Sequence, residues 1–408
     1  MRVFLGIDWA DGTHRVAHVD EQGQCVAIDS LEESATGLAE FGRWLEAQRE
    51  TGIEVYAGIE RPDGRVVEML LRHGAVVYAL NPKAVDRARD RHRANRCKDD
   101  DIDAYVIGEL VRTDHPHLHP LLLNSAQCEE LRSLTRDYHR FVRRQTRLLQ
   151  QLTATLKEYY PLALELFADL TTQTAQDFLQ RYGTPGKATA LTRQQWTAFV
   201  RRHRMAQADA EQRWAKLRAG QALVPDHVVR ANARRMEALL RELATILATV
   251  AEYRAEIERC FAALPASKLT ESLPVGGDGV VIATIWAGLG DAQGRWSSPA
   301  HFQAQAGVVP GTQRSGKQRT GVIFFRHGCD HLLRYALTQY AFISLGHCEW
   351  AKAYYKQQRA RGHGHSRALR ALGAKWAKIF VAMWQRQMPY DENHHLANIA
   401  RQQLRRAA

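Results

Sequence analysis

The chain has 408 residues, of which 45% are hydrophobic, and this length is enough for two or three domains with a substantial buried core. Its 56 Lys and Arg residues exceed its 44 Asp and Glu residues, and the resulting charge of +12 favours nucleic acid or an anionic membrane as a partner. The longest apolar stretch, from Val280 to Leu289, is too short to span a bilayer, and the first residues lack the apolar segment of a signal peptide, so we expect no membrane association and a cytoplasmic location.

The first 115 residues alternate between predicted strands and helices. Apolar runs predict strands at 2–8, 15–20, 24–29, 53–60 and 75–80. Helices are predicted at Leu38 to Leu45, at 66–71, and from the acidic run near residue 100 onward. The order β-β-β-α-β-α-β-α, with helices that join parallel strands, is that of an RNase H-like (RuvC-like) α/β domain, which we place at residues 1–115.

Two acidic residues end predicted strands. Asp8 closes the first strand in Gly6-Ile7-Asp8, and Glu60 closes the fourth in Gly58-Ile59-Glu60. If these strands are parallel neighbours, both carboxylates emerge at the same edge of the sheet, where open α/β folds bind ligands. In each strand the glycine two positions earlier lies on the same face and leaves space beside the acid. The alternative is that each acid is a helix cap or a surface charge.

Four carboxylates lie within five positions of one another, at Asp99, Asp100, Asp101 and Asp103. They repel one another unless they are solvated or held by a multivalent cation. On a helix, Asp100 and Asp103 project to one side, and the pair of Asp99 and Asp103 is the alternative. A solvated, capped helix N-terminus is the other interpretation of the run. With the two strand-end acids, Asp100 and Asp103 predict a site for two divalent ions, which we expect to be Mg²⁺.

Residues 82–98, directly before the acidic run, carry seven positive charges against two negative ones. This imbalance indicates a polyanion close to the acids. The candidate nucleic-acid-binding residues are Arg87, Arg89, Arg91 and Arg93. Acids that bind metal beside bases that bind phosphate are what metal-dependent phosphodiester chemistry requires.

The middle of the chain is predicted to be helical from residue 125 to 264. Apolar residues recur at helical intervals over 128–160 and 230–264, so two long helices are expected, which could pair as a coiled coil. Simple core packing or dimerisation is the alternative role of these apolar stripes. Residues 162–229 are expected to form short helices.

Glycine-rich turns begin near residue 265, and we expect a mainly α-helical domain at 265–390 followed by a poorly ordered basic tail at 391–408. Ser315 lies in a strongly basic loop of this domain. Arg314, Lys317 and Arg319 are close enough to it to hold a phosphate and stabilise developing charge. A serine before a glycine is otherwise a turn former.

The order of these motifs resembles the DEDD signature of the RuvC-like transposases of bacterial insertion sequences, the group that is guided by a bridge RNA. The N-terminal resemblance rests on Gly6-Ile7-Asp8, on Glu60, on Asn81-Pro82 and on residues 98–104, in which Asp99 stands where the family has Thr. The C-terminal resemblance rests on residues 306–310, with Val308 in place of Leu, and on Ser315-Gly316.

The resemblance implies a bacterial DNA transposase in which Ser315 attacks DNA beside Mg²⁺ held by Asp8, Glu60, Asp100 and Asp103. It implies donor and target DNA and a noncoding bridge RNA as partners. It also implies dimers that assemble into a tetramer, with the serine and the acids of one site supplied by different subunits. The alternatives are a metal-dependent, junction-resolving nuclease that uses water as its nucleophile, and a noncatalytic nucleic-acid-binding protein.

Overall fold

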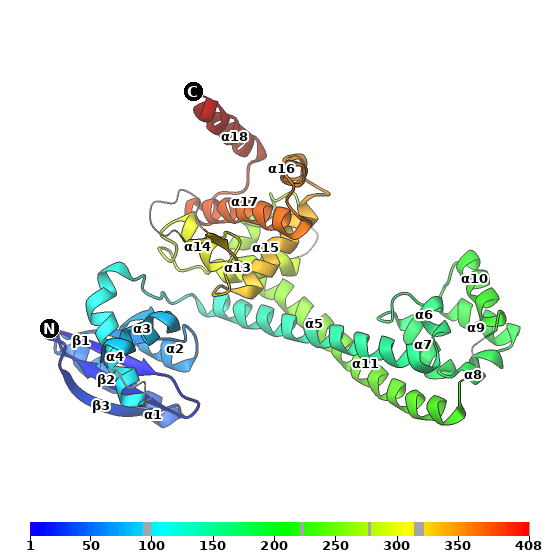
Figure 1. Ribbon diagram of the computed structural model, residues 1–408, viewed down its shortest axis with the longest axis horizontal. Helices are drawn as coiled ribbons and strands as arrows, with labels where there is room; N and C mark the ends of the chain where they lie inside the picture. The colour runs from blue at the N-terminus through cyan, green and yellow to red at the C-terminus, as the bar shows by residue number, and fades with distance from the viewer. Residues whose placement is uncertain (93–98, 221–223, 276–278, 314–321, 408) are drawn as a thin grey trace. The chain divides into compact units, whose positions relative to one another are not determined.

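The computed structural model describes residues 1–92, 99–220, 224–275, 279–313 and 322–407 (Figure 1). The chain divides into two compact units: unit 1 comprises residues 1–128 and 290–301, and unit 2 comprises residues 129–289 and 302–408. The stretch 290–301 therefore packs with the N-terminal part of the chain, from which it is far removed in sequence. Across the described ranges, we find no helix with the length and apolar character needed to cross a membrane.

Unit 1 is built on a mixed sheet of five strands in the order β3-β2-β1-β4-β5. The strands are β1 (Arg2–Asp8), β2 (Thr13–Val19), β3 (Cys25–Glu32), β4 (Glu54–Ile59) and β5 (Val76–Ala79). β1 is antiparallel to β2 and parallel to β4, which in turn is parallel to β5. This topology is compatible with the RNase H-like fold that the sequence predicts.

Helices cover both faces of the sheet. They are α1 (Ala35–Glu50), α2 (Arg65–Arg72), α3 (Pro82–His92) and α4 (Asp100–Asp114), which is followed by the short 3₁₀ helix η1 (His115–His117). Alternation along β1 separates the two faces: Leu5 and Ile7 pack into the core under α1 and α2, and Phe4 packs into the core under α3 and α4. Asp8 therefore belongs to the α4 face.

Helix α3 departs from the sequence prediction, in which Asn81-Pro82 only ended a strand. The side-chain oxygen of Asn81 accepts a hydrogen bond from the backbone N–H of Lys83 at 2.9 Å. Proline is favourable in the first turn of a helix, because its fixed φ suits the helix and its missing N–H would be unpaired there anyway. The same two residues that end β5 therefore also begin α3.

Unit 2 contains two long helices, α5 (Ala126–Tyr159) and α11 (Asp226–Ala262), which run antiparallel to each other (Figure 1). In the first half of α5, the ring centroid of Phe141 lies 5.1 Å from that of Tyr253, and the Tyr138 hydroxyl accepts a hydrogen bond from Arg254 at 3.0 Å. At the other end of the pair, Tyr159 lies near Glu237. The two predicted helices are present, and a coiled-coil geometry for them stays a prediction.

Five short helices connect the long pair, in agreement with the prediction for residues 162–229. They are α6 (Leu162–Leu166), α7 (Gln173–Tyr182), α8 (Pro185–Thr189), α9 (Arg193–Arg202) and α10 (Gln207–Arg218). Fully buried Tyr160, Phe178 and Trp196 form the centre of a core that the ends of α5 and α11 complete. The large aromatic area buried here stabilises the far end of the long pair.

The C-terminal part of unit 2 is mainly helical. Its elements are α12 (Ala266–Thr270), α13 (Gly279–Leu289), α14 (Pro299–Gln305), β6 (Gly311–Gln313), β7 (Val322–Phe324), α15 (His331–Ser344), α16 (Glu349–Ala360), α17 (His365–Arg386) and α18 (Glu392–Ala407). Buried Tyr340 of α15 packs edge-on against Trp376 and Phe380 of α17, with ring centroids 5.0 and 5.1 Å away.

The basic tail at 391–408, for which the sequence suggests poor order, contains the helix α18 (Glu392–Ala407). This helix has an anchor near its start, where the imidazole of His395 packs against the Trp350 ring with centroids 4.5 Å apart. The residue just before the tail is also fixed, because the N–H of Tyr390 donates to the Ser272 hydroxyl at 2.7 Å. Aromatic contacts with residues distant in sequence thus order a segment whose composition is mostly polar and basic.

Candidate active site

The ends of two neighbouring parallel strands bring Asp8 and Glu60 to one edge of the sheet. In the register of β1 and β4, Ile7 lies opposite Ile59, so the next residue on each strand is one of these acids. Asp8 is the last residue of β1, and Glu60 directly follows β4. Both side chains are half-buried. The prediction that these strands are parallel neighbours is confirmed.

Glycines on these strands let α4 pack directly onto the sheet. A Cβ atom added to Gly6 would lie 1.8 Å from the backbone oxygen of Ala104, and one added to Gly58 would lie 2.5 Å from a methyl group of Val111. On the helix, a Cβ atom on Gly108 would lie 2.9 Å from a methyl group of Val19. The space at these glycines is therefore filled by α4, whereas the sequence suggested free space beside each acid.

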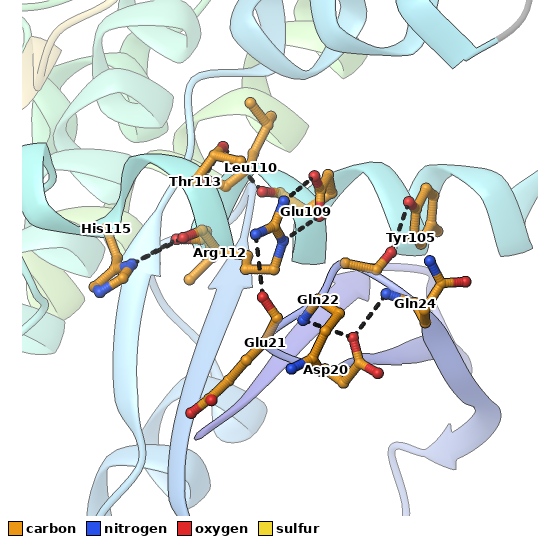
Figure 2. Close-up of polar contacts among 12 residues, drawn as sticks. Asp20, Glu21, Gln22, Gln24, Tyr105, Glu109, Leu110, Arg112, Thr113 and His115 are labelled. Carbon is orange, nitrogen blue, oxygen red and sulfur yellow. Dashed lines mark hydrogen bonds and ion pairs between the residues drawn. The ribbon is translucent and has the colours of Figure 1, made fainter. Parts of the chain in front are cut away.

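Polar contacts fix the other side of α4 to the turn between β2 and β3 (Figure 2). The Tyr105 hydroxyl donates to the backbone oxygen of Gly23 at 3.1 Å, and Arg112 donates to the backbone oxygen of Glu21 at 3.3 Å. Two further hydrogen bonds of 2.6 Å join the Arg112 guanidinium to the Glu109 carboxylate. These contacts hold the helix, and so the acidic residues in its first turn, in a fixed position over the sheet.

Asp8, Asp100 and Asp103 form a group that is suited to a metal ion. Each offers a carboxylate oxygen, and these three oxygens all lie within 4.8 Å of one another. Asp103 is only 2% exposed, whereas Asp100 is exposed and Asp8 is half-buried. Hard oxygen donors at this spacing match the preference of Mg²⁺ and similar divalent cations. Of the four acids in the predicted site, the structure brings these three together, and Glu60 is not part of the group.

The other acids of the run have different contacts. Asp99 is the N-cap of α4, and its side chain accepts a hydrogen bond from the backbone N–H of Asp101 at 3.1 Å. The carboxylate of Asp101 pairs with Arg15 of β2, with an N–O distance of 2.5 Å. The structure therefore places Asp100 in the acidic group and Asp99 at the helix cap, and the metal-binding role of Asp100 stays a prediction.

Arg89 of α3 supplies a positive charge to this acidic group. Its guanidinium pairs with the buried carboxylate of Asp103 and, at 3.0 Å, with that of Asp86. Burial alone lowers the pKa of Arg89, but the charges and hydrogen bonds of these two carboxylates outweigh burial and raise it above its ordinary value. In the structure Arg89 neutralises part of the charge of the acidic group, and its binding of nucleic acid stays a prediction.

His14 fixes the segment that follows Asp8. The imidazole is completely buried; its Nδ1 atom accepts a hydrogen bond from the backbone N–H of Ala10 at 3.1 Å, and its Nε2 atom lies 3.3 Å from Glu33. Burial lowers the pKa of His14, and the opposing charge of Glu33 only partly offsets this. The neutral ring that burial favours is the form that can accept the Ala10 hydrogen bond. Nothing in the sequence pattern indicated this role.

The remaining candidates lie on α3 or in the C-terminal domain. Arg87 and Arg91 are exposed on α3. Arg93 and the C-terminal candidates Arg314, Ser315, Lys317 and Arg319 lie outside the described residues, and so do residues 276–278. The described chain reaches both ends of the Ser315 loop, because β6 and β7 pair as an antiparallel hairpin with Thr312 opposite Ile323.

Two known families of proteins match separate parts of the chain. Residues 5–161 match a family of transposases of the DEDD type from the IS110 group, and residues 268–356 match the IS116/IS110/IS902 family of transposases. The first match contains all four acids of the predicted metal site. The second contains the hairpin and the loop that carries Ser315.

Individual relatives are similar over half of the chain or nearly all of it. A mini-circle putative transposase for IS117 from Streptomyces coelicolor is 29% identical over 97% of both chains. A putative transposase, y4uE, from Sinorhizobium fredii is 34% identical over 51% of this chain and 58% of its own length. An uncharacterized 42 kDa protein of insertion element IS900 from Mycobacterium paratuberculosis is 23% identical over 93% of this chain and 95% of its own.

Proposed function

We propose that this chain, a transposase with an IS110-type DEDD domain and an IS116/IS110/IS902-type transposase domain, cuts and rejoins DNA through Ser315 and an acidic, metal-binding site. The main observation in support is the group that Asp8, Asp100 and Asp103 form at the edge of the sheet. Membership of a DEDD transposase family supports the use of a divalent metal ion at these carboxylates. We propose that Glu60 is the fourth ligand and that the ion is Mg²⁺.

The residues present fit such an ion. Their donors are carboxylate oxygens, and the buried charge of Asp103 has Arg89 beside it as a counter-charge. A bound divalent ion neutralises the charge that develops at a phosphodiester and at the departing oxygen. Asp8 and Asp103 hold the site on the rigid frame of β1 and α4, which keeps the ligands in place before DNA arrives.

Ser315 is proposed as the nucleophile. Its Oγ atom attacks the phosphorus atom of a phosphodiester, one phosphorus–oxygen bond of the DNA breaks, and the serine proton ends on the departing sugar oxygen. The product is a phosphoserine ester, which conserves the energy of the broken bond for rejoining. The resemblance to this group of transposases implies that one active site takes the acids and the serine from different subunits of a tetramer built of dimers, and we propose the same arrangement for this chain.

The test of the serine step is covalent trapping. The unchanged protein, mixed with end-labelled donor and target DNA and Mg²⁺ and then denatured, is expected to carry labelled DNA, because a phosphoserine ester survives denaturation. Ser315→Ala is expected to give no adduct. Ser297→Ala, which changes an exposed serine elsewhere in the chain, should give the normal amount. DNA cleavage at the full rate by Ser315→Ala, with no adduct in any sample, would establish the water-using nuclease instead.

A noncoding guide RNA is proposed as the second nucleic-acid partner, alongside donor and target DNA. The net charge of +12 supports two polyanionic partners, and pairing with RNA can supply sequence specificity while the protein holds the backbone. Sequencing of the RNA that co-purifies with the full chain is expected to yield one strongly enriched, discrete species. A featureless background of cellular RNA would contradict guided recombination but leave the serine chemistry open to the trapping test.

A further inference from the structure

A cavity of about 640 Å³ lies in unit 2 at the base of the β6–β7 hairpin. Its walls come from α17, from α16, and from the residues that directly precede β6 and follow β7. Val308 to Pro310 form the wall before the hairpin, and Phe325 and Arg326 form the wall after it. The cavity therefore adjoins both strands between which the Ser315 loop runs in sequence.

The lining of this cavity is strongly cationic. Its titratable side chains include Arg326, His363, Arg367, Arg370, Lys375 and Lys378. Among the described residues that line it, none is an Asp or a Glu. Within the described ranges, no ion pair joins Arg326, Arg367 or Arg370 to a carboxylate, although such pairs are frequent elsewhere in the chain. A concentration of positive charge on the wall of a cavity is typical of a site for an external polyanion.

The proximity and burial of these positive side chains are energetically unfavourable. Burial is the main cause that lowers the pKa of Arg370, and repulsion from the neighbouring guanidiniums of Arg334 and Arg367 lowers it further. The Nε atom of Arg326 is buried and has no hydrogen-bond partner among the described residues. A buried donor without a partner is destabilising, and so is a cluster of like charges. An anion that accepts hydrogen bonds from these guanidiniums would pair the buried donor and reduce the repulsion between the like charges.

Aromatic packing holds two of these guanidiniums in place. The guanidinium carbons of Arg334, a neighbour of the cavity, and of Arg370, which lines it, lie 4.5 and 4.6 Å from the centroid of the Phe325 ring. Cation–π contacts of this kind order the arginine side chains before a ligand binds. Less conformational entropy is then lost on binding, which favours affinity.

Helix α17 presents its cations along one side. Arg367, Ala371, Lys375 and Lys378 follow one another at helical spacing on the cavity side, while Leu372, Trp376 and Phe380 of the same helix are buried in the core. The rise of an α-helix places Arg367 and Lys378 about 16 Å apart along the axis. This length suits several successive phosphates of one strand better than a single small anion.

We propose that this cavity binds the phosphodiester backbone of the DNA strand that the transposase cuts. The choice of DNA, and of the reacting strand, rests on the proposed function, because the cavity walls continue into the hairpin whose loop carries Ser315. In this role α17 and Arg326 hold phosphates next to the one that reacts, and they set the position of the strand relative to the hairpin.

The test is equilibrium binding by the full chain to fluorescein-labelled 30-base-pair DNA of random sequence, in EDTA so that no cleavage takes place. The double variant Arg367→Gln/Lys378→Gln changes two exposed residues and should leave the fold intact. We expect its affinity to fall about tenfold at 0.15 M salt, and its slope of log affinity against log salt to decrease by about 1.8, because two phosphate contacts are lost.

The matched control is Lys352→Gln/Lys356→Gln on α16. It removes the same charge from two exposed positions. Each of these lies two residues from Tyr354 or Gln358, which line the cavity, and residues two positions apart face opposite sides of a helix. We expect less than a twofold loss of affinity. Arg367→Lys/Lys378→Arg, which keeps the charge, should bind normally. Equal losses in the Gln variants of α16 and α17, or a loss in the charge-preserving variant, would overturn the proposal.

Parallel titrations with RNA of the same sequence separate the two polymers. If the α17 variant loses affinity for RNA and keeps its affinity for DNA, the cavity is an RNA site and the proposal is wrong. Because binding is measured without metal, the result is independent of the adduct assay. If the α17 variant loses affinity for DNA, the proposed role of the cavity is supported even when the unchanged protein forms no adduct. If the unchanged protein forms an adduct but the α17 variant keeps its affinity for DNA, only the serine step is supported.

Discussion

Asp8→Asn, Asp100→Asn and Asp103→Asn each reduce the rate of DNA cleavage by at least about a thousandfold, because a bound divalent ion contributes several kcal/mol to the stabilisation of the transition state. In the proposed site, the three carboxylate oxygens that lie within 4.8 Å of one another would hold this ion, and an amide oxygen is a much weaker ligand than a carboxylate. Affinity for DNA, measured without metal, should change by less than about threefold, since neutralising one acid near a polyanion weakens no contact.

Asp101→Asn is the matched control for these substitutions. It removes a charge from the same acidic run, but its carboxylate pairs with Arg15 and is not part of the three-acid group. Cleavage by this variant should stay near the normal rate. Titration with Mn²⁺, followed by electron paramagnetic resonance, should show weaker binding in Asp8→Asn and Asp100→Asn but not in Asp101→Asn. Unchanged Mn²⁺ binding in Asp8→Asn and Asp100→Asn would show that the ion is held elsewhere. An equal loss of cleavage in these two variants, in Asp103→Asn and in Asp101→Asn would show the same.

Glu60→Gln decides whether Glu60 belongs to the same site. The proposal gives it the role of fourth ligand, so both cleavage and Mn²⁺ affinity should fall. The structure places it beside Asp8 in the register of β1 and β4 but outside the three-acid group. Normal Mn²⁺ binding by Glu60→Gln would restrict the metal site to the three aspartates.

The local parts of the site could be predicted because they depend on short-range patterns. A helix between two strands indicated a parallel crossover, and both acids were expected at one edge if the two strands were neighbours. The register of β1 and β4 shows that they are parallel neighbours. The acidic run could be assigned to a helix start because Asp is favourable there. The choice between Asp99 and Asp100 required the cap geometry, in which the Asp99 side chain accepts from the N–H of Asp101.

The parts that could not be predicted depend on contacts between residues distant in sequence. Arg89 lies 14 positions before Asp103, and its pairing with that buried acid needs the packing of α3 against α4. The stretch 290–301 packs with unit 1 because Asp291 accepts a hydrogen bond from the backbone N–H of Ser125 at 2.9 Å, across 166 positions. Composition and periodicity carry no information about such pairs. The cationic cavity could not be predicted for the same reason, because its walls come from four separate segments of the chain.

Gly6→Ala is expected to destabilise unit 1 by roughly 3 kcal/mol or more, since overpacking a tightly filled core at a backbone contact costs that much. The added Cβ atom would lie 1.8 Å from the backbone oxygen of Ala104 and 2.3 Å from the backbone nitrogen of Gly108, and neither atom can move without the helix. Helix α4 must therefore shift away from β1. Because Asp100 and Asp103 are on that helix and Asp8 is on that strand, the acidic group opens and cleavage should fall as well.

Gly12→Ala is the control for Gly6→Ala. A Cβ atom at Gly12 meets nothing within 4 Å, and this residue lies in the same unit, just after β1. We expect the unfolding temperature of the full chain to be lower for Gly6→Ala and nearly unchanged for Gly12→Ala. Amide hydrogen exchange should become faster in β1 and α4 of Gly6→Ala but stay normal in α13, α15 and α17, because those helices belong to unit 2. Normal exchange in α4 would mean that the helix does not rest on Gly6, and the frame that positions Asp100 and Asp103 against Asp8 would need another explanation.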